Sequence, residues 1–283
     1  MLDRRPPLLW TEQNRSTWDE RAALHLRDTN GFYALDRFRA GEDTLLDIEG
    51  KEIGDIAGRH LLHLQCHFGL DALSLARRGA IVTGLDFSAT AIEAARQLAA
   101  EARLPAHFVQ ADLYEAMNVL EGGFDIVFVN WGSLNWLPDI YRWADNVAGL
   151  LAPGGFLYLA EQHPHLSTMR EVDGRLEPAF PWRTPIDDPV VSETPTSYNG
   201  DETPLVNQRL HEWEHPLSDI IGGLLEAGLR LDFFHEFEVL PWQRLPMMVQ
   251  TNDRFYRLPD GQPPMPLAFS LKAYKPYYGD GSW

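Results

Sequence analysis

The chain has 283 residues, of which 45% are hydrophobic, and this is enough to bury the core of one α/β domain with insertions. Its formal net charge is −17 and lysine occurs only at positions 51, 272 and 275, so DNA, RNA and anionic membranes are poor partners. No apolar run approaches the ~20 residues of a membrane span, and the N-terminus lacks the apolar stretch of a secretory signal, which favours a cytoplasmic protein.

Residues 1–57 are predicted to form a helical N-terminal cap, with helical character over 15–29. Strands and helices then alternate. The strands are expected at 60–66, 80–85, 107–110, 124–130 and 156–161, and the helices at 70–78, 88–102 and 139–151. Ser88 is the expected N-cap of the second of these helices, and Pro153-Gly154-Gly155 is expected to end the third. This alternation predicts a parallel sheet with right-handed crossovers.

Order lapses in two proline-rich segments, 162–210 and 240–266, which we interpret as lid insertions because long loops in compact domains are usually functional. A helix at 217–227 leads into strands at 229–239 and 267–275. Since no helix joins these two strands, they are expected to form an antiparallel pair at one edge. The prediction is a Rossmann-like α/β domain over 58–283. It has a seven-stranded, mostly parallel sheet with an antiparallel edge strand and helices on both faces.

Two acidic residues follow neighbouring strands of this predicted sheet. The first strand ends in a tight turn at Cys66–Gly69, Asp86 follows the second strand, and Asp112 follows the third. Ligands bind at the carboxyl edge of such sheets, and Asp86 is placed to accept hydrogen bonds from a ribose diol. Either aspartate alone is more often a turn or N-cap residue, but their joint placement favours a nucleotide site.

The chain resembles the class I S-adenosylmethionine-dependent methyltransferases over residues 57–163, and architecturally in its last helix and strand pair. The resemblance rests on the order of elements, on Asp86, on Ala111-Asp112-Leu113, and on Pro153-Gly154-Gly155. The segment HLQCHFGLD, with DFS after the second strand, further resembles a bacterial small-molecule branch of that superfamily. The superfamily pattern is an acidic residue followed by G-x-G-x-G, and the corresponding places here hold His63, Gln65, His67 and Gly69.

The resemblance implies S-adenosylmethionine as cofactor. The cofactor-binding residues that it implies are Gln65, Cys66, His67, Gly69, Asp86, Phe87, Asp112, Leu113 and Asn130. Asp86 would bind the ribose hydroxyls, Phe87 would border the adenine, and Asp112 with the Leu113 backbone would contact its amino edge. Gly69 would let the backbone approach the ligand, whereas Gln65 and His67 would point away or contact the methionine moiety. Cys66, the only cysteine, is either a thiol near the cofactor or a small residue at a strand end.

The fifth strand would deliver a catalytic base to the same edge, where Glu161, His163 and His165 lie. His163 is the preferred base because an unperturbed imidazole titrates near neutral pH, and Glu161 is the second candidate. The alternative is that both side chains only hydrogen-bond the loop.

Aromatic residues supply the predicted substrate contacts. They are Trp131, Trp136, Tyr198 and Trp213, and Trp182 and Trp242 also fall in loops on the expected ligand side. As a set they indicate an apolar or aromatic pocket, or an aromatic cage for a cationic nitrogen. The histidines at 60, 63, 67, 211 and 215 lack metal-ligand spacing, so no metal site is predicted.

The predicted function is methyl transfer to the oxygen or nitrogen of a small molecule, such as an aromatic compound or a natural-product intermediate. A nucleic-acid acceptor is disfavoured because the run Asn130-Trp131-Gly132-Ser133 lacks the Pro-Pro of nucleic-acid amino-methyltransferases. One alternative is a protein that binds S-adenosylmethionine without transferring its methyl group. An NAD-dependent dehydrogenase is a further alternative, but G-x-G-x-x-G is missing. The sequence leaves the acceptor and the oligomeric state open.

Overall fold

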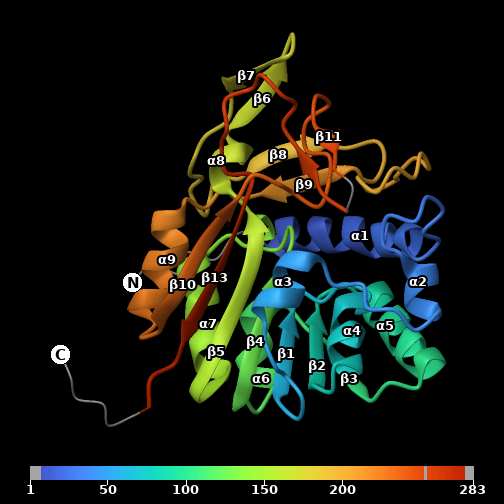
Figure 1. Ribbon diagram of the computed structural model, residues 1–283, viewed down its shortest axis with the longest axis vertical. Helices are drawn as coiled ribbons and strands as arrows, with labels where there is room; N and C mark the ends of the chain where they lie inside the picture. The colour runs from blue at the N-terminus through green and yellow to red at the C-terminus, as the bar shows by residue number, and fades with distance from the viewer. Residues whose placement is uncertain (1–7, 252–253, 278–283) are drawn as a thin grey trace.

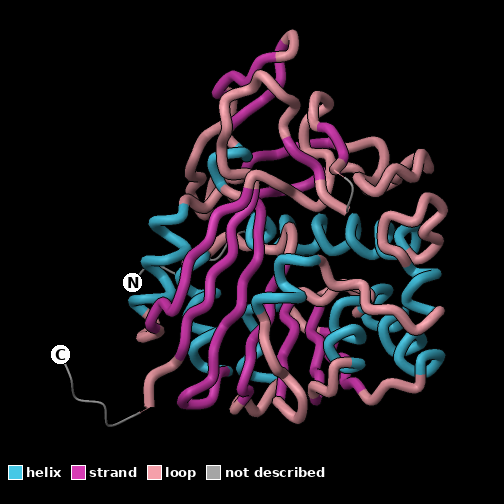
Figure 2. The backbone as a smooth tube through the Cα atoms, viewed as in Figure 1, coloured by secondary structure: helices cyan, strands magenta, loops and turns pink. Residues whose placement is uncertain are grey.

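A seven-stranded sheet runs through the molecule, with helices on both of its sides (Figure 1, Figure 2). The computed structural model describes residues 8–251 and 254–277. The strand order is β10-β13-β5-β4-β1-β2-β3, and the neighbours from β5 to β3 pair in parallel. β13 runs antiparallel to both β5 and the edge strand β10. The predicted Rossmann-like fold is confirmed, and the strand that reverses is the second one from the edge.

The strands of this sheet are β1 (His60–Leu64), β2 (Ile81–Asp86), β3 (Ala106–Gln110), β4 (Phe124–Asn130), β5 (Leu151–Gln162), β10 (Arg230–Phe237) and β13 (Ala268–Tyr274). The helices between them are α4 (Leu70–Arg77), α5 (Ala89–Ala102), α6 (Ala116–Val119), α7 (Ile140–Leu150) and α9 (Leu217–Glu226), with 3-10 turns η1 (Leu113–Glu115) and η2 (Leu134–Trp136). Ser88 caps α5 as predicted, because its side chain accepts the Ala91 N–H. Residues 153–155 do not form a separate turn but an irregular stretch inside β5, which starts at Leu151.

Alternate residues of the central strands face two separate cores. Leu61 and Phe128 pack with residues of α4 and α5 on one face. Leu62 and Val127 pack with residues of α7 and α9 on the other. All four side chains are fully buried, and burial of both sheet faces explains why these strands are continuously apolar in sequence. None of the helices in the described ranges has the length and apolar character that crossing a bilayer requires.

Three helices precede the sheet: α1 (Leu8–His25), α2 (Leu35–Arg39) and α3 (Asp47–Glu52). Figure 1 shows α1 lying across the molecule between the sheet and the insertions above it. Asp19 of α1 accepts hydrogen bonds from the Ser88 hydroxyl (2.6 Å) and the Thr90 N–H (3.1 Å) at the start of α5. Asn14 exchanges two hydrogen bonds with the backbone of His211 (2.8 and 2.9 Å). α1 therefore ties the ligand edge of the sheet to the insertions. Residues 1–7 of the predicted cap lie outside the described residues.

The two predicted insertions contain short antiparallel strand pairs. The short helix α8 (Pro164–Ser167) starts the first insertion. The strands are β6 (Met169–Val172), β7 (Arg175–Pro178), β8 (Val190–Glu193), β9 (Arg209–Glu212), β11 (Val249–Gln250) and β12 (Tyr256–Arg257). They pair as β6–β7, β8–β9 and β11–β12, and Figure 1 shows them above α1. These strands have two to four residues, and only Leu210 and His211 of β9 are buried, so the sequence carried no apolar alternation that could predict them.

Candidate functional site

The turn after β1 has an alternating left-handed backbone. Gln65, His67 and Gly69 have φ angles of 55°, 50° and 76°. Left-handed backbone costs a non-glycine residue on the order of 1–2 kcal/mol, which explains why a glycine-rich sequence suits such a turn. In this chain two of the three positions carry side chains instead, and strain of this kind is typical of functional sites.

Gly69 is required by packing rather than by approach to a ligand. A Cβ at this residue would lie 2.7 Å from the Phe108 ring and 2.8 Å from Ala95, both of which belong to the core. The prediction that this glycine makes room for a ligand is therefore corrected: the side that lacks a Cβ faces β3 and α5. Cys66 belongs to the same core. It is 3% exposed, and burial raises the pKa of its thiol well above its usual range, so the geometry favours the small-residue interpretation.

Gln65 directs a polar group toward the ligand edge. Its Nε2 donates to the backbone oxygen of Ser133 (2.8 Å), which joins the turn to the end of β4. Its Oε1 is buried and has no hydrogen-bond partner among the described residues. A buried acceptor without a donor is costly, so this oxygen is available for a ligand that brings one.

The His67 ring instead contacts the N-terminal helices. Its Nε2 lies 2.7 Å from Nδ1 of His25, which also contacts the Tyr33 hydroxyl (2.8 Å) and, through Nε2, the Ser197 hydroxyl (2.6 Å). Burial lowers the pKa of His67 to about 3 and that of His25 to about 2, so both rings are neutral at physiological pH. This cluster joins the turn, α1 and the first insertion.

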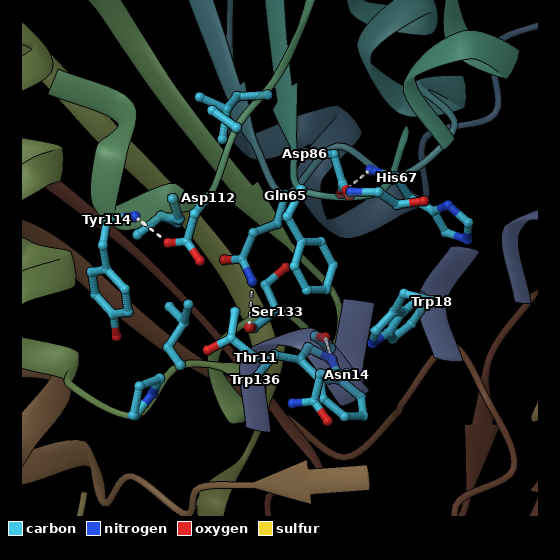
Figure 3. Close-up of a pocket in the computed structure, with 18 of the residues that line it drawn as sticks. Thr11, Asn14, Trp18, Gln65, His67, Asp86, Asp112, Tyr114, Ser133 and Trp136 are labelled. Carbon is cyan, nitrogen blue, oxygen red and sulfur yellow. Dashed lines mark hydrogen bonds between the residues drawn. The ribbon is translucent and has the colours of Figure 1, made fainter. Parts of the chain in front are cut away.

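Asp86 and Asp112 face one cavity between the ends of β2 and β3 (Figure 3). Asp86 is buried; its Oδ2 accepts the His67 N–H and its Oδ1 accepts the Ser88 N–H, each at 2.9 Å. Burial raises the pKa of Asp86 to about 6 and also raises that of Asp112. Asp112 accepts the Tyr114 N–H through Oδ1 (2.8 Å), and no hydrogen bond to its Oδ2 is found among the described residues. Both carboxylates thus retain free lone pairs at the cavity.

This first cavity has a volume of about 110 Å³ and opens into a larger one. Phe87 and Leu113 line it beside the two aspartates. Its opposite wall is α1, through Thr11, Asn14 and Trp18, as Figure 3 shows. These three residues could not be predicted from the sequence, because helical periodicity indicates where a helix forms but not which element its exposed face covers.

A larger cavity continues from the first toward α3 and the insertions. The residues shared by the two are Trp18, Gln65, His67, Trp131, Gly132, Trp136, Tyr198 and Trp213. All four predicted substrate residues are therefore brought together at the junction. Cys66, Gly69 and Asn130 line the larger cavity only. Asn130 donates to Asp71 (2.8 Å) and its Oδ1 contacts His63 Nε2 (3.0 Å), so its side chain belongs to a buried polar network.

Glu161 holds the backbone after β4. Its two oxygens accept the N–H groups of Gly132, Ser133, Leu134 and Gln162 at 2.7 to 3.2 Å. The carboxylate lines the larger cavity, but these four donors use it as an anchor for the turn that carries Trp131 and Trp136. The geometry therefore supports a positioning role and not that of a base.

His163 does not reach either cavity. Its Nδ1 accepts the His165 N–H (3.1 Å) as the N-cap of α8, and its Nε2 lies 3.1 Å from Glu236 on β10. The backbone does emerge at the ligand edge, as expected, but the ring turns back toward β10. The structure thus does not support the predicted role of His163 as a base. It instead matches the alternative in which this side chain only binds the loop.

No group of three histidine, cysteine, aspartate or glutamate side chains that could hold a metal ion occurs among residues 8–251 and 254–277. His63 is buried and contacts Asn130 through Nε2, and His211 contacts Gln13 through Nε2 (2.6 Å). Glu214, by contrast, lines the larger cavity, and burial followed by the nearby carboxylates raises its pKa to about 7. Glu214 could not be predicted from the sequence, since a glutamate in an irregular segment has no distinguishing pattern.

Residues 61–155 match the family model described as a methyltransferase domain, and this region contains β1 to β4, the start of β5 and both aspartates. By this match the region is similar to methyltransferase domains, and the fold is the one seen in S-adenosylmethionine-dependent methyltransferases. The methyltransferase domain is 34% identical over 105 residues to the ubiquinone biosynthesis O-methyltransferase of Coxiella burnetii, covering 37% of this chain and 44% of that protein. It is 35% identical over 145 residues to the trans-aconitate 2-methyltransferase of Paracidovorax citrulli, covering 49% and 52%. The chain thus spans about half the length of these curated relatives.

Solved structures share the fold over more of the chain. An S-adenosylmethionine-dependent methyltransferase from Mesorhizobium loti aligns with a TM-score of 0.52 and 19% identity, covering 78% of this chain and 93% of that one. The complex of DhpI with SAH aligns with a TM-score of 0.55 and 16% identity, covering 94% and 97%. The match to the methyltransferase domain model covers residues 61–155, so α1 precedes it and Glu161, Tyr198 and Trp213 follow it. The cavity is therefore built partly from the matched domain and partly from segments outside the match.

Proposed function

We propose that the protein transfers a methyl group from S-adenosylmethionine to the oxygen or nitrogen of a small molecule. One observation carries this proposal: Asp86 and Asp112, at the ends of adjacent strands, present free carboxylate lone pairs to the same cavity beside the strained first turn. Ligands of doubly wound sheets bind at this edge.

The residues present fit the cofactor. Asp86 would accept the ribose hydroxyls, and Asp112 would accept the adenine amino group with the Leu113 backbone beside it. Phe87 would border the adenine ring. The buried Gln65 Oε1, which has no partner among the described residues, would accept a hydrogen bond from the methionine end. Asn130 lies farther along, in the larger cavity.

The bound cofactor supplies a methyl group on a sulfonium centre, which an oxygen or nitrogen nucleophile displaces in line. The protein's task is then mostly to position the acceptor and exclude water. Trp131, Trp136, Tyr198 and Trp213 line the junction of the two cavities, where the acceptor would lie. Glu161 anchors the turn between Trp131 and Trp136, because it accepts the N–H groups of Gly132, Ser133 and Leu134.

A hydroxyl or ammonium acceptor must also lose a proton. Because His163 faces β10, we assign proton removal to Glu214, which lines the larger cavity and has a pKa of about 7, suited to general-base catalysis. With a hydroxyl acceptor, Glu214→Gln should lower turnover at least tenfold, and the loss of rate below about pH 7 should disappear. His163→Ala is the matched control and should keep most of the activity. If His163→Ala is as slow as Glu214→Gln, or Glu214→Gln retains full activity, the assignment fails.

The acceptor class rests on the cavity and on the relatives. Those relatives are named for ubiquinone biosynthesis and for trans-aconitate, both small molecules, which supports a small-molecule acceptor. The net charge of −17 supports a neutral or cationic acceptor rather than a nucleic acid or an anionic membrane. Location in the cytoplasm is part of the same proposal.

Calorimetry with S-adenosylhomocysteine and with NAD tests the cofactor, and formation of S-adenosylhomocysteine from S-adenosylmethionine with a panel of phenols and arylalkylamines tests the reaction. We expect binding of the first ligand, none of NAD, and turnover with at least one acceptor. Binding of NAD alone would indicate a dehydrogenase. Binding of S-adenosylhomocysteine without turnover of any acceptor would favour a protein that holds the cofactor without transferring its methyl group.

A further inference from the structure

A buried carboxylate from α3 stands at one end of the larger cavity. Glu49 is 0% exposed, and its Oε1 accepts the Leu46 N–H (2.9 Å) and the Trp131 indole N–H (3.0 Å). Its Oε2 is buried and has no hydrogen-bond partner among the described residues, although Glu49 lines the cavity. The protein therefore holds Oε1 in place with two hydrogen bonds, whereas Oε2 remains available to a donor from a ligand.

A second carboxylate lies close by. Asp71, in the first turn of α4, also lines the larger cavity and accepts a hydrogen bond from Asn130 Nδ2 (2.8 Å). No ion pair joins Glu49 or Asp71 to a lysine, arginine or histidine in the ranges that the structure describes. The cation of Arg254 lies near enough to act on Asp71, but its Nη1 donates to the Thr44 carbonyl (2.6 Å).

A fully buried carboxylate beside a partly buried one, with no bonded cation, is costly. Burial, and then the Asp71 charge, raises the pKa of Glu49 to about 7, and burial raises that of Asp71. A positive ligand placed between them would remove much of this cost, because it would supply both a counter-charge and N–H donors.

The adjoining wall suits a cation as well. The rings of Trp131 and Trp242 meet edge to face with centroids 6.4 Å apart, and both line the larger cavity. Indole faces attract ammonium groups, most strongly where water is excluded. Trp131 is also the residue whose N–H fixes Glu49, so the aromatic wall and the carboxylate form one unit.

We propose that Glu49 and Asp71 form a subsite for a protonated amine, with the ammonium group donating to Glu49 Oε2 and lying against Trp131. The inference rests on the proposed function, which provides two sources of such a group. One source is the amino-acid end of the cofactor, and the other is an amine of the methyl acceptor.

Glu49→Gln is the decisive variant. A glutamine Oε1 keeps both existing hydrogen bonds, and only the oxygen without a partner becomes an NH2 group, which repels an N–H donor. Glu52→Gln is the matched control, since it removes the same charge from the same helix at a residue that contacts Tyr158 and His235 and does not line the cavity. Asp71→Asn provides a second variant.

Two calorimetric comparisons distinguish the sources. The first uses S-adenosylhomocysteine and 5′-methylthioadenosine, which lacks the amino-acid end. The second uses benzylamine and benzyl alcohol on the protein saturated with S-adenosylhomocysteine. If the cofactor supplies the ammonium, Glu49→Gln should weaken S-adenosylhomocysteine roughly tenfold to a hundredfold and leave methylthioadenosine unchanged. If the acceptor supplies the ammonium, Glu49→Gln should lose affinity by such a factor for benzylamine only.

The wild-type protein gives an independent measurement in case the variants do not fold. It should prefer S-adenosylhomocysteine over the analogue with hydrogen in place of the amino group, or benzylamine over benzyl alcohol, by at least tenfold. The subsite is overturned if the wild-type protein shows a smaller preference in both pairs of ligands. It is also overturned if Glu49→Gln and Glu52→Gln bind every probe with equal affinity. Failure of the wild-type protein to bind either S-adenosylhomocysteine or methylthioadenosine would instead overturn the proposed function.

Discussion

Replacing Asp86 by asparagine should weaken cofactor binding and at the same time stabilise the ligand-free protein. Asp86 is 7% exposed and accepts one backbone N–H at each oxygen. Its burial raises the pKa from 3.8 to about 6, which shows that the folded protein disfavours the charge that the ligand would require. A site of this kind exchanges stability for binding.

The magnitudes follow from this shift. A carboxyl with a folded-state pKa above its unfolded value destabilises the protein increasingly as pH rises from 3.8 to about 6, and the full cost remains above that pH. At neutral pH the cost is on the order of 3 kcal/mol. The asparagine side chain in Asp86→Asn would carry no charge but would leave one backbone N–H without an acceptor, at about 1–2 kcal/mol. The net gain is about 1–2 kcal/mol, or roughly 2–3 °C in Tm for a chain of 283 residues.

Binding should change in the opposite direction. Loss of hydrogen bonds from the ribose hydroxyls to a charged acceptor costs about 1.5–3 kcal/mol, which raises the Kd of S-adenosylhomocysteine roughly tenfold to a hundredfold. In the wild-type protein those bonds favour the ionised form of Asp86. Affinity should therefore fall below about pH 6, by up to about tenfold per pH unit, as the carboxylate becomes protonated. In Asp86→Asn this dependence should vanish.

Calorimetric titration with S-adenosylhomocysteine between pH 5 and 8, together with thermal unfolding of the ligand-free protein, measures both effects. Asp145→Asn is the control, because Asp145 is exposed on α7 and its loss removes the same charge away from the cavity. An Asp86→Asn protein with unchanged Kd and a lower Tm would show that Asp86 only holds the turn, and would refute the reasoning.

Three further outcomes are expected. Asp112→Ala should raise the Kd of S-adenosylhomocysteine and of methylthioadenosine by the same factor, about tenfold, because its free oxygen faces the adenine end; a change in only one ligand would contradict this role. Gly69→Ala should destabilise the protein by about 2–5 kcal/mol, because the new Cβ would meet Phe108 at a φ of 76°. Gly58→Ala, with a φ of 74° and open space around it, should cost only about 1 kcal/mol, and similar Tm values for the two variants would reject the packing argument. Segments 162–210 and 240–266 should gain hydrogen-exchange protection with S-adenosylhomocysteine plus acceptor, and equal protection in both states would exclude a lid.

The sequence alone determined the sheet and its ligand edge. Strands buried on both faces leave continuous apolar runs, and helices between them leave a 3.6-residue period, so β1 to β4, α4, α5 and α7 were predictable within a few residues. The end of β5 was predicted too, but its start at Leu151 was not. The positions of Asp86 and Asp112 followed directly, because the carboxyl ends of parallel strands meet at one edge. The residue pattern within each element and the order of the elements were enough to predict the sheet and the positions of the two aspartates.

Only the tertiary structure decided the directions of side chains and the partners of the remaining segments. The position of His163 after β5 was foreseen, but its ring orientation depends on Glu236, 73 residues later. The Glu161 carboxylate accepts backbone N–H groups of Gly132 and Ser133, which follow β4, whereas Glu161 itself belongs to β5. Likewise, Glu49 and Asp71 meet Trp131 and Asn130 through long-range packing that leaves no periodic trace in the sequence. Hydrogen bonds between distant residues carry no local pattern, whereas apolar burial within an element does, and this difference separates what could be predicted from what could not.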